Sequence, residues 1–504
     1  MLLEILGMAM INPTLDNMEN LDRIAYENKH IKTIEVVKDN YSGEYDFPHR
    51  FDNFNKYYSE HETEIKNVIE DFNSRKMKNE QYLKWVSLPQ EQLKGHLTEI
   101  YSQANKLKMR KDKIDRPLVV LGIGGSKHTS EFLLNMTGYN DKDVYFYSDI
   151  DPLSFDNFIK STKVGIQNLN FLVVSKSGQT FETQDAFKRF EQELIDYYIA
   201  NGVRPKDARV KAQQHFAICT DKFAKEENLR EQVRNNPNYI QNLYVHDGVG
   251  GRFSMFDDAS LFVLAYAGVP QSYTTRILQA AQKVSNKSTD PSNIQNNIAM
   301  KNAMFNAYSR SKGHKILYQQ YFGRFFEQGG ENWGKQLYLE SLKDFDYMAS
   351  KAPDSMHYAT EGLYNHVNRK NYYVVMTIID PNVSTNYKHY TAAIKDTYTQ
   401  ENPLILETLA VEGDSIKPEA IGEYIQTKHF EIVYTGCMRR ALNKHHKNDI
   451  YIQYPEVMQF NVELYKKKFK IKKEDFKKLN DSDVNRFNLQ EDYEKYNVVP
   501  GRKN

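Results

Sequence analysis

Short apolar runs alternate with amphipathic segments along the central part of the chain. The clearest runs before residue 280 lie within RPLVVLGIGG, KDVYFYSD, LNFLVVSKSG and QHFAICTD, and a turn signal follows each of them. The segments between these runs repeat apolar residues at spacings of three and four, as amphipathic helices do. Strands that alternate with helices predict a mainly parallel sheet with helices packed on both faces. The expected fold class is therefore α/β.

A second alternating region follows a polar stretch, SNKSTDPSNIQNN at 285–297, in which seven of the thirteen residues are Ser or Asn. This composition is typical of a linker. Beyond it, we expect strands in KNYYVVMTIIDP (370–381) and KHFEIVYTGCM (428–438). A chain of 504 residues also exceeds what one core usually supports. The predicted organisation is an N-terminal helical segment packed on the outside, two α/β domains each with a mainly parallel sheet, and a polar C-terminal tail, with bounds 1–95, 96–285, 286–475 and 476–504.

Composition limits the classes of partner. The 67 basic and 66 acidic residues leave a formal net charge of +1, which argues against nucleic acid as the main partner. No apolar run approaches the roughly 20 residues of a membrane-spanning helix, so no membrane association is expected. The sequence starts without the basic segment of a signal peptide. Cys219 and Cys437 both lie in apolar runs and are expected to be free, buried thiols of a cytoplasmic protein.

The first turn with candidate chemistry is LGIGGSKHTS, where a strand meets Gly124, Gly125 and Ser126 and a helical pattern follows. Glycine lets the backbone approach a ligand closely, and the free N–H groups at a helix start attract an anion. Asp149 and Asp151 follow the next strand, as a dinucleotide site requires, although the third glycine of that fingerprint is absent. An anion site, a dinucleotide site and a purely structural turn all remain open here.

The second turn is VVSKSGQTF, which gathers hydroxyl groups and one cation after a strand. Ser175, Ser177 and Thr180 offer hydroxyl donors, Lys176 offers an ammonium group, and Gly178 gives the turn conformational freedom. Because these residues precede a predicted helix start, the set suits a phosphate monoester. The turn lacks the GxxxxGK[ST] pattern of a nucleoside triphosphate loop. The structural alternative, in which Thr180 only caps the helix, accounts for one hydroxyl group of the three.

The third turn is DGVGGRFSMF, in which two glycines precede Arg252. An arginine held in this way can present fixed donors to a carboxylate, a phosphate or a developing oxyanion. The alternative is that Arg252 is the partner in a structural ion pair.

Taken together, LGIGGS, VVSKSGQTFETQ, GVGGRFS and GGENWGK, in this order and at these separations, resemble the glucose-6-phosphate isomerase family. A C-terminal QFNVELYKK extends the resemblance, which runs from about residue 95 to 470. The family's fold implies two sugar-isomerase domains, each a mainly parallel sheet sandwiched by helices. The chain departs from the family at Asn332 and Trp333, and also at Gly178 and Gln179, where some members have more threonines.

The resemblance implies a role for each matching residue. Glu331 matches the catalytic base, Arg252 the arginine beside the developing negative charge, and Lys466 the lysine near the C-terminus. His357 is implied as the ring-opening histidine, with His366 as the alternative, and Glu182 as the carboxylate that orients it. The implied substrate-binding residues are Gly124, Ser126, Ser175, Lys176, Ser177, Thr180, Gln328 and Gln459.

The reaction implied is the interconversion of glucose 6-phosphate and fructose 6-phosphate through an enediolate, in glycolysis and gluconeogenesis. A carboxylate suits removal of a proton from a carbon beside a carbonyl group, and this chemistry needs no cofactor and no metal. The family also implies a homodimer with an active site shared between subunits, so that His357 would act on the partner's substrate. Two other functions stay open: a non-catalytic sugar-phosphate-binding regulator and an NAD-dependent sugar-phosphate dehydrogenase.

Overall fold

The computed structural model describes residues 40–46, 54–77, 83–109, 115–139, 144–178, 180–222, 229, 233, 236–342, 346–357, 371–399 and 402–442. Its strands are β1 Tyr41–Asp46, β2 Leu118–Leu121, β3 Val144–Tyr147, β4 Asn170–Ser175, β5 Phe216–Asp221, β6 Ile240–Val245, β7 Ile316–Phe322, β8 Asp346–Ala352, β9 Tyr372–Ile379, β10 Leu404–Leu409, β11 Val411–Glu412 and β12 Ser415–Ile416. Its α-helices are α3 Phe54–Glu60, α4 Glu62–Met77, α5 Leu88–Glu91, α6 Leu97–Lys108, α7 Gly125–Thr137, α8 Pro152–Ser161, α9 Phe181–Ala200, α10 Pro205–Gln213, α12 Asp258–Tyr266, α13 Gln271–Ser288, α14 Ile298–Ser311, α15 Gly330–Ser341, α17 Thr385–Thr399 and α18 Pro418–Leu442.

The first sheet has the order β3-β2-β4-β5-β6, and all its neighbouring strands pair in parallel. Alternate residues of β2 and β4 enter two different apolar clusters, because successive side chains of a strand point to opposite faces. Val119 and Phe171 join the cluster that contains residues of α8, α9 and α10, while Val120 and Leu172 join the cluster of α6, α7 and α12. Burial on both faces explains why these strands read as continuous apolar runs.

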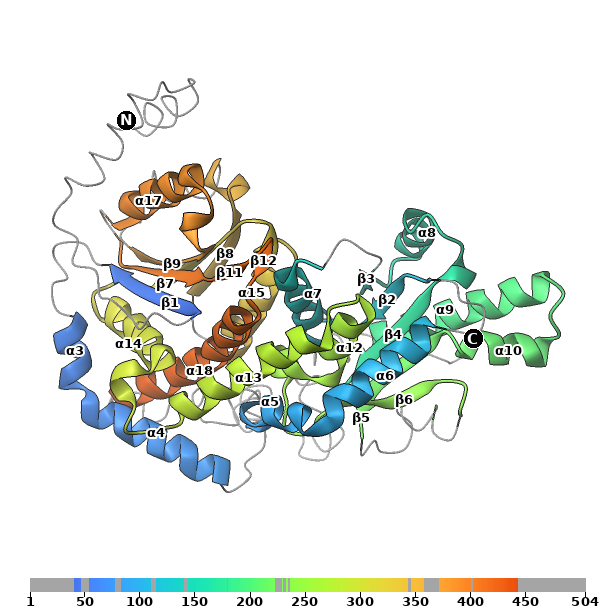
Figure 1. Cartoon of the computed structure of the whole chain (residues 1–504), viewed down its shortest axis with the longest axis horizontal. Coiled ribbons are helices and arrows are strands. Elements are labelled where there is room, and N and C mark those ends of the chain that lie inside the picture. The colour runs from blue at the N-terminus through green and yellow to red at the C-terminus, as the bar shows by residue number, and fades with distance from the viewer. Residues whose placement is uncertain are drawn as a thin grey trace, which may run out of the picture.

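The second sheet has the order β1-β10-β9-β7-β8. Strands β7 to β10 pair in parallel, and β1 joins β10 antiparallel at the edge. Figure 1 shows the two sheets toward opposite sides of the molecule, with α7, α12, α13, α15 and α18 between them. The predicted α/β class with two mainly parallel sheets flanked by helices is confirmed.

The predicted strand at 428–438 is wrong, because these residues lie in the middle of α18. The helix packs against α13 and α14, and Phe430, Ile432 and Val433 are all buried within it. A helix that is buried on all sides carries apolar residues on all sides, so its sequence resembles that of a buried strand. Tertiary packing therefore overrides the strand preference of this β-branched and aromatic run.

Three further local expectations differ from the structure. Residues 41–46, within the predicted N-terminal helical segment, form β1 and extend the second sheet. Helix α13 continues to Ser288, so the first part of the predicted linker is helical. The glycines on both sides of Glu331 in GGENWGK predict a loop, but Glu331 lies in the first turn of α15. Tail residues beyond 442 lie outside the described part of the chain.

The described residues include both cysteines and the long helices that bear on the predicted thiols and on membrane spanning. Cys219 and Cys437 are buried thiols that do not form a disulfide, as expected. Among the helices that the structure describes, none is both long enough and apolar enough to cross a bilayer.

Candidate functional site

The first two candidate turns follow neighbouring strands at the point where the order of the first sheet reverses. Strand β2 lies between β3 and β4, so the chain leaves β2 toward one side and returns to the other. In α/β sheets, ligands bind outside the carboxyl ends of strands at such a switch point. A Cβ atom on Gly122, after β2, would lie 3.3 Å from the carbonyl oxygen of Val174 in β4. The two turns are therefore adjacent in space.

Internal hydrogen bonds hold the turn after β4. The Oγ of Ser175 donates to Oγ1 of Thr180 at 3.0 Å and accepts from the N–H of Gly178 at 3.1 Å. Gly178 has a φ of +65°, in the region that favours glycine. Thr180 is the residue before α9, yet its side chain makes no capping hydrogen bond to that helix. The helix-capping alternative for Thr180 is therefore not what the structure shows.

The remaining polar residues of this turn are less enclosed. Ser177 and Thr180 are half-buried, as is Glu182 in the first turn of α9, whereas Ser175 is buried. The first backbone N–H groups of α9 lie in the same turn, where the helix dipole favours an anion. The turn thus combines hydroxyl groups, a helix start and the ammonium group of Lys176.

Lys176 connects the turn after β4 with the turn after β6. Its Nζ donates to the carbonyl oxygen of Val249 at 3.0 Å. Burial lowers the pKa of Lys176, while the carboxylates of Asp247 and Asp221 act in the opposite direction. Because Val249 lies three positions before Arg252, this hydrogen bond fixes the third candidate turn against the second.

Gly125 and Gly251 bring the first and third candidate turns into backbone contact. Gly125 begins α7, and Gly251 begins the short 3₁₀-helix Gly251–Phe256. A Cβ atom on Gly125 would overlap with the carbonyl group of Gly251, so the position requires glycine. A substitution at Gly251 has a different effect, since a Cβ atom there would lie 3.6 Å from Cα of Gly125, which is an ordinary contact.

Arg252 is buried and points to the last turn of α15. Its Nε donates to Oγ of Ser341 at 2.8 Å, and its Nη1 lies 2.9 Å from Oε2 of Glu340. Burial lowers the pKa of Arg252, and the neighbouring carboxylate of Glu340 acts in the opposite direction. The carbonyl oxygen of Arg252 accepts from Nε1 of Trp333 at 3.0 Å. The structural ion pair considered from the sequence is therefore present.

Glu331 lies in the first turn of the same helix, which follows β7. The second sheet also reverses its order at β7, because β8 and β9 lie on either side of that strand. The Glu331 carboxylate contacts the ammonium group of Lys335, four residues later on the helix. Gln336 of α15 lies close to the first candidate turn, since a Cβ atom on Gly124 would be 3.0 Å from its Nε2. Helix α15 thus joins Glu331 to both glycine turns of the first sheet.

The structure places the other predicted residues as follows. Ser126 is half-buried at the start of α7, and Gln328 is exposed between β7 and α15. His357 ends the short 3₁₀-helix Asp354–His357 after β8, and its side chain lies outside the described residues. His366, Gln459 and Lys466 also lie outside them.

Sequence reasoning missed four contacts of the site on α15. They involve Trp333, which lies within GGENWGK, and Gln336, Glu340 and Ser341, which lie outside the motifs recognised in the sequence. Gln336 donates to Oε1 of Glu340 at 3.1 Å across one helical turn. The i,i+4 spacing of the two residues is the signal that could have indicated this pair. Nothing in the sequence indicates that Trp333, Glu340 and Ser341 contact Arg252.

Known proteins are similar to this chain both in sequence and in structure. The sequence is 28% identical over 325 residues to glucose-6-phosphate isomerase of Staphylococcus haemolyticus, covering 61% of this chain and 65% of that protein. It is 27% identical over 326 residues to the isomerase of Staphylococcus aureus strain Mu3, covering 61% of this chain and 66% of that protein. In both cases, the match spans less than two thirds of the relative's length. No protein-family model matches the sequence.

The structure is similar to that of a glucose-6-phosphate isomerase from Chlamydia trachomatis, with a TM-score of 0.62 and 14% identity over 88% of this chain and 97% of the other. A hypothetical protein from Thermus thermophilus gives the same TM-score, with 17% identity over 78% of this chain and 94% of the other. These two likenesses establish the fold. In both sequence and fold, the chain is thus similar to glucose-6-phosphate isomerases. In this chain, the turns after β2, β4 and β6 and helix α15 form one connected set of residues.

Proposed function

We propose that the chain is an aldose–ketose isomerase that interconverts glucose 6-phosphate and fructose 6-phosphate. The observation that carries the proposal is the connection between a turn suited to a phosphate and a carboxylate on a separate helix. Lys176 joins the turn after β4 to the Arg252 turn, and Arg252 contacts α15, whose first turn bears Glu331. A site with one anchor and one base separated in this way suits a substrate with a phosphate at one end and a carbonyl group at the other.

In the proposed reaction, the turn formed by residues 175–180 holds the phosphate through its hydroxyl groups, its backbone N–H groups and the positive end of α9. Binding energy from this non-reacting end would keep the sugar in register. Gly124 and Ser126 would contact the sugar from the neighbouring turn, and Gln328 and Gln459 would do so from the C-terminal half.

Glu331 would then move a proton between C2 and C1 of the open sugar. The intermediate is an enediolate, and a fixed guanidinium group stabilises such a charge most when it is already oriented. Arg252 is oriented by Ser341 and Glu340, which supports this role without making it a proton donor. By family resemblance, His357 would open the ring with Lys466 assisting, and Glu182 would orient the histidine.

The proposal extends to the setting of the enzyme. We infer a homodimer whose active sites are shared, with His357 supplied by the neighbouring subunit. We also infer a cytoplasmic role in glycolysis and gluconeogenesis.

The experiment that tests the reaction is incubation of purified chain with fructose 6-phosphate in deuterated water without added cofactor. We expect deuterium at C2 of the glucose 6-phosphate formed, followed by NMR. The Glu331→Gln variant should lose about 10²- to 10⁴-fold in rate, the range of general acid–base catalysis. Glu327→Gln is the matched control, because Glu327 is an exposed residue four positions earlier.

Three results would contradict the proposal. Full activity of Glu331→Gln would exclude Glu331 as the base. Binding of fructose 6-phosphate without any deuterium exchange would indicate a non-catalytic sugar-phosphate regulator. A thermal shift with NAD(H) or NADP(H), accompanied by cofactor reduction or oxidation, would indicate a dehydrogenase that uses the LGIGGS turn.

A further inference from the structure

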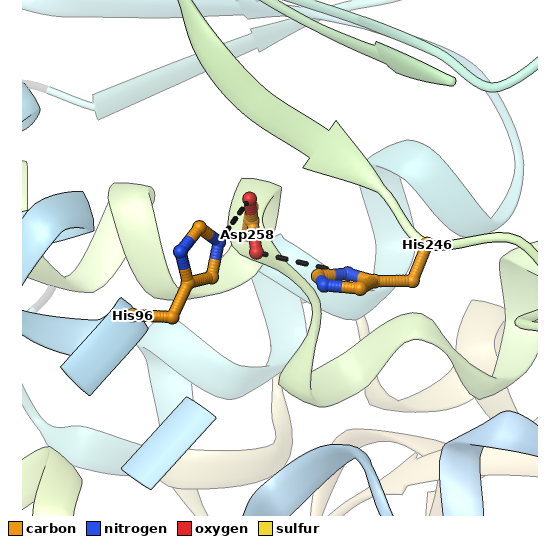
Figure 2. Close-up of side chains that lie close together, drawn as sticks. All are labelled: His96, His246 and Asp258. Atoms are coloured by element: carbon orange, nitrogen blue, oxygen red, sulfur yellow. Dashed lines mark hydrogen bonds and ion pairs between the residues drawn. The ribbon is translucent and has the colours of Figure 1, made fainter. Parts of the chain in front are cut away.

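Two histidines and an aspartate from three separate elements converge at the base of the Arg252 turn. His96 directly precedes α6, His246 directly follows β6, and Asp258 begins α12. Figure 2 shows the two imidazole rings on either side of the Asp258 carboxylate. The nearest nitrogen or oxygen atoms of the three side chains all lie within 4.8 Å of one another. They form a compact set of one carboxylate and two imidazoles.

The charge of this cluster needs compensation. Asp257 and Asp258 are adjacent in the chain, and both are almost completely buried. In the described part of the chain, their ion pairs are with His96 and His246. Burying two carboxylates without compensating charge is costly. Two protonated imidazoles could supply that charge, and so could one divalent cation held by two neutral imidazoles.

The distances agree with a metal site. His96 Nε2 lies 2.9 Å from Oδ2 of Asp258, and His246 Nδ1 lies 3.8 Å from Oδ1 of Asp258. Ligand atoms about 2.1 Å from a tetrahedral Zn²⁺ ion lie about 3.4 Å from each other, a value between these two distances. The separation of 3.8 Å is too long for a hydrogen bond. The rings remain 24% and 21% exposed, which leaves solvent access to the cluster.

The surrounding contacts orient the three side chains as the outer shell of a metal site does. Gln92 donates to Oδ1 of Asp258 at 2.9 Å, and the backbone N–H of Tyr244 donates to Oδ2 at 2.8 Å. On the far side of its ring, His96 Nδ1 lies 3.5 Å from the carboxylate of Glu99. The His96 ring and the central carboxylate therefore have outer contacts that orient them before any ion binds.

We propose that His96, His246 and Asp258 bind one divalent transition-metal ion, with Zn²⁺ as the best match. Imidazole ligands favour Zn²⁺ and its neighbours, whereas Mg²⁺ and Ca²⁺ favour oxygen ligands alone. Asp257 supplies a second carboxylate beside the same cluster, since its Oδ1 lies 2.5 Å from His246 Nδ1. The ion would tie the start of α6 and the start of α12 to the segment that leads from His246 to Arg252. This site is separate from the proposed isomerisation, and its role is to hold that segment.

The test uses the full-length chain, stripped with a chelator and then titrated with Zn²⁺ by calorimetry. We expect about one equivalent bound per chain and a rise in melting temperature on Zn²⁺ addition, because an ion that binds only the folded state stabilises it. His96→Gln and His246→Gln should each weaken Zn²⁺ binding by at least about tenfold and reduce the thermal shift. Glutamine keeps an N–H donor at each position, and circular dichroism checks that both variants fold. Mg²⁺ should not compete.

The matched control is His445→Gln with His446→Gln, because the sequence KHHKND offers two adjacent histidines elsewhere. This control should retain the Zn²⁺ affinity of the parent chain. Zn²⁺ binding that disappears in the control and persists in His96→Gln and His246→Gln would overturn the proposal. So would the absence of stoichiometric Zn²⁺ binding to the parent chain, which would leave the cluster as carboxylates compensated by protonated imidazoles.

Discussion

Arg252 and Glu340 form an ion pair of 2.9 Å that joins the turn after β6 to the last turn of α15. The Arg252 side chain is 5% exposed, whereas the Glu340 side chain is 38% exposed. The ion pair thereby attaches the Arg252 turn, which follows a strand of the first sheet, to α15, which follows a strand of the second sheet and bears the candidate base Glu331. The two residues are 88 positions apart in the sequence.

Glu340→Gln should weaken both stability and turnover. The substitution leaves a buried guanidinium group without its charged partner, and partial solvent access at Glu340 limits the cost to about 1–3 kcal/mol in the free energy of unfolding. Turnover of fructose 6-phosphate should fall about tenfold or more, because misplacement of catalytic groups is costly. Urea unfolding and a coupled isomerase assay measure the two effects. Unchanged values for both, as expected for the exposed control Glu327→Gln, would show that the pair is not needed.

Gly125→Ala and Gly251→Ala should differ sharply although the two glycines touch. The new methyl group would overlap with backbone atoms at position 125 but make only an ordinary contact at position 251. We expect Gly125→Ala to lose about 1–3 kcal/mol of stability, as overpacked sites do, and Gly251→Ala to stay close to the parent chain. Thermal or urea unfolding of both variants checks this. Equal losses in the two variants would contradict the asymmetry of the contact.

Ser175→Ala should loosen the proposed phosphate turn while leaving the fold intact. The variant loses the hydroxyl group that links Gly178 to Thr180, at a cost of about 1 kcal/mol. Because this hydroxyl group stabilises the turn conformation that is proposed to bind phosphate, affinity for inorganic phosphate and for glucose 6-phosphate should drop about three- to tenfold. Titration calorimetry with each ligand measures the loss. Ser161→Ala on α8, an exposed serine, is the control, and equal affinities in the two variants would count against the role of the turn.

His429 should make stability fall in acid. It is buried among Trp85, Phe253 and Trp333, and its Nε2 has no hydrogen-bond partner among the described atoms. Burial lowers the pKa of His429 to about 3 from its ordinary value of 6.5. As the pH falls below about 6.5, the imidazole of His429 becomes protonated in the unfolded chain, whereas in the folded chain it stays neutral down to about pH 3. The folded state therefore loses stability across that pH range.

The loss attributable to His429 approaches about 1.4 kcal/mol per pH unit below its ordinary pKa. Urea unfolding at pH 7, 6 and 5 should therefore show a steeper decline for the parent chain than for His429→Leu, which removes the titrating ring. Other groups titrate in both proteins, so the difference between the two slopes is the relevant quantity. Parallel slopes would contradict a buried neutral imidazole at this position.

The sequence was most informative where burial and turn chemistry coincide. The strands at 118–121, 170–175 and 372–379 were predictable because buried parallel strands read as apolar runs. The run at 428–438 carries the same composition, yet it lies in a helix surrounded by α13 and α14, and only the packing distinguishes the two cases. Strand β1 was missed because its partner, β10, follows it by more than three hundred positions.

The candidate site shows the same division. The turns with Gly124, Ser175 and Arg252 were predictable from local residue types, because glycine and hydroxyl residues after an apolar run are typical of turns. Their mutual contacts were not predictable, since they depend on how two sheets and α15 pack together. No sequence motif indicates the cluster of His96, His246 and Asp258, because its three residues come from three separate elements.

Helix α15 carries Glu331 in its first turn and Glu340 in its last, nine residues or about 14 Å apart along the axis. If a helix of this length moves as a rigid body, a displacement of one end changes the position of the other end. A small displacement of the Arg252 turn would reach the far end of α15 as a tilt of the Glu331 carboxylate. Under the proposed function, substitutions around Arg252 would therefore act on the candidate base Glu331 through α15, without any contact between the two residues.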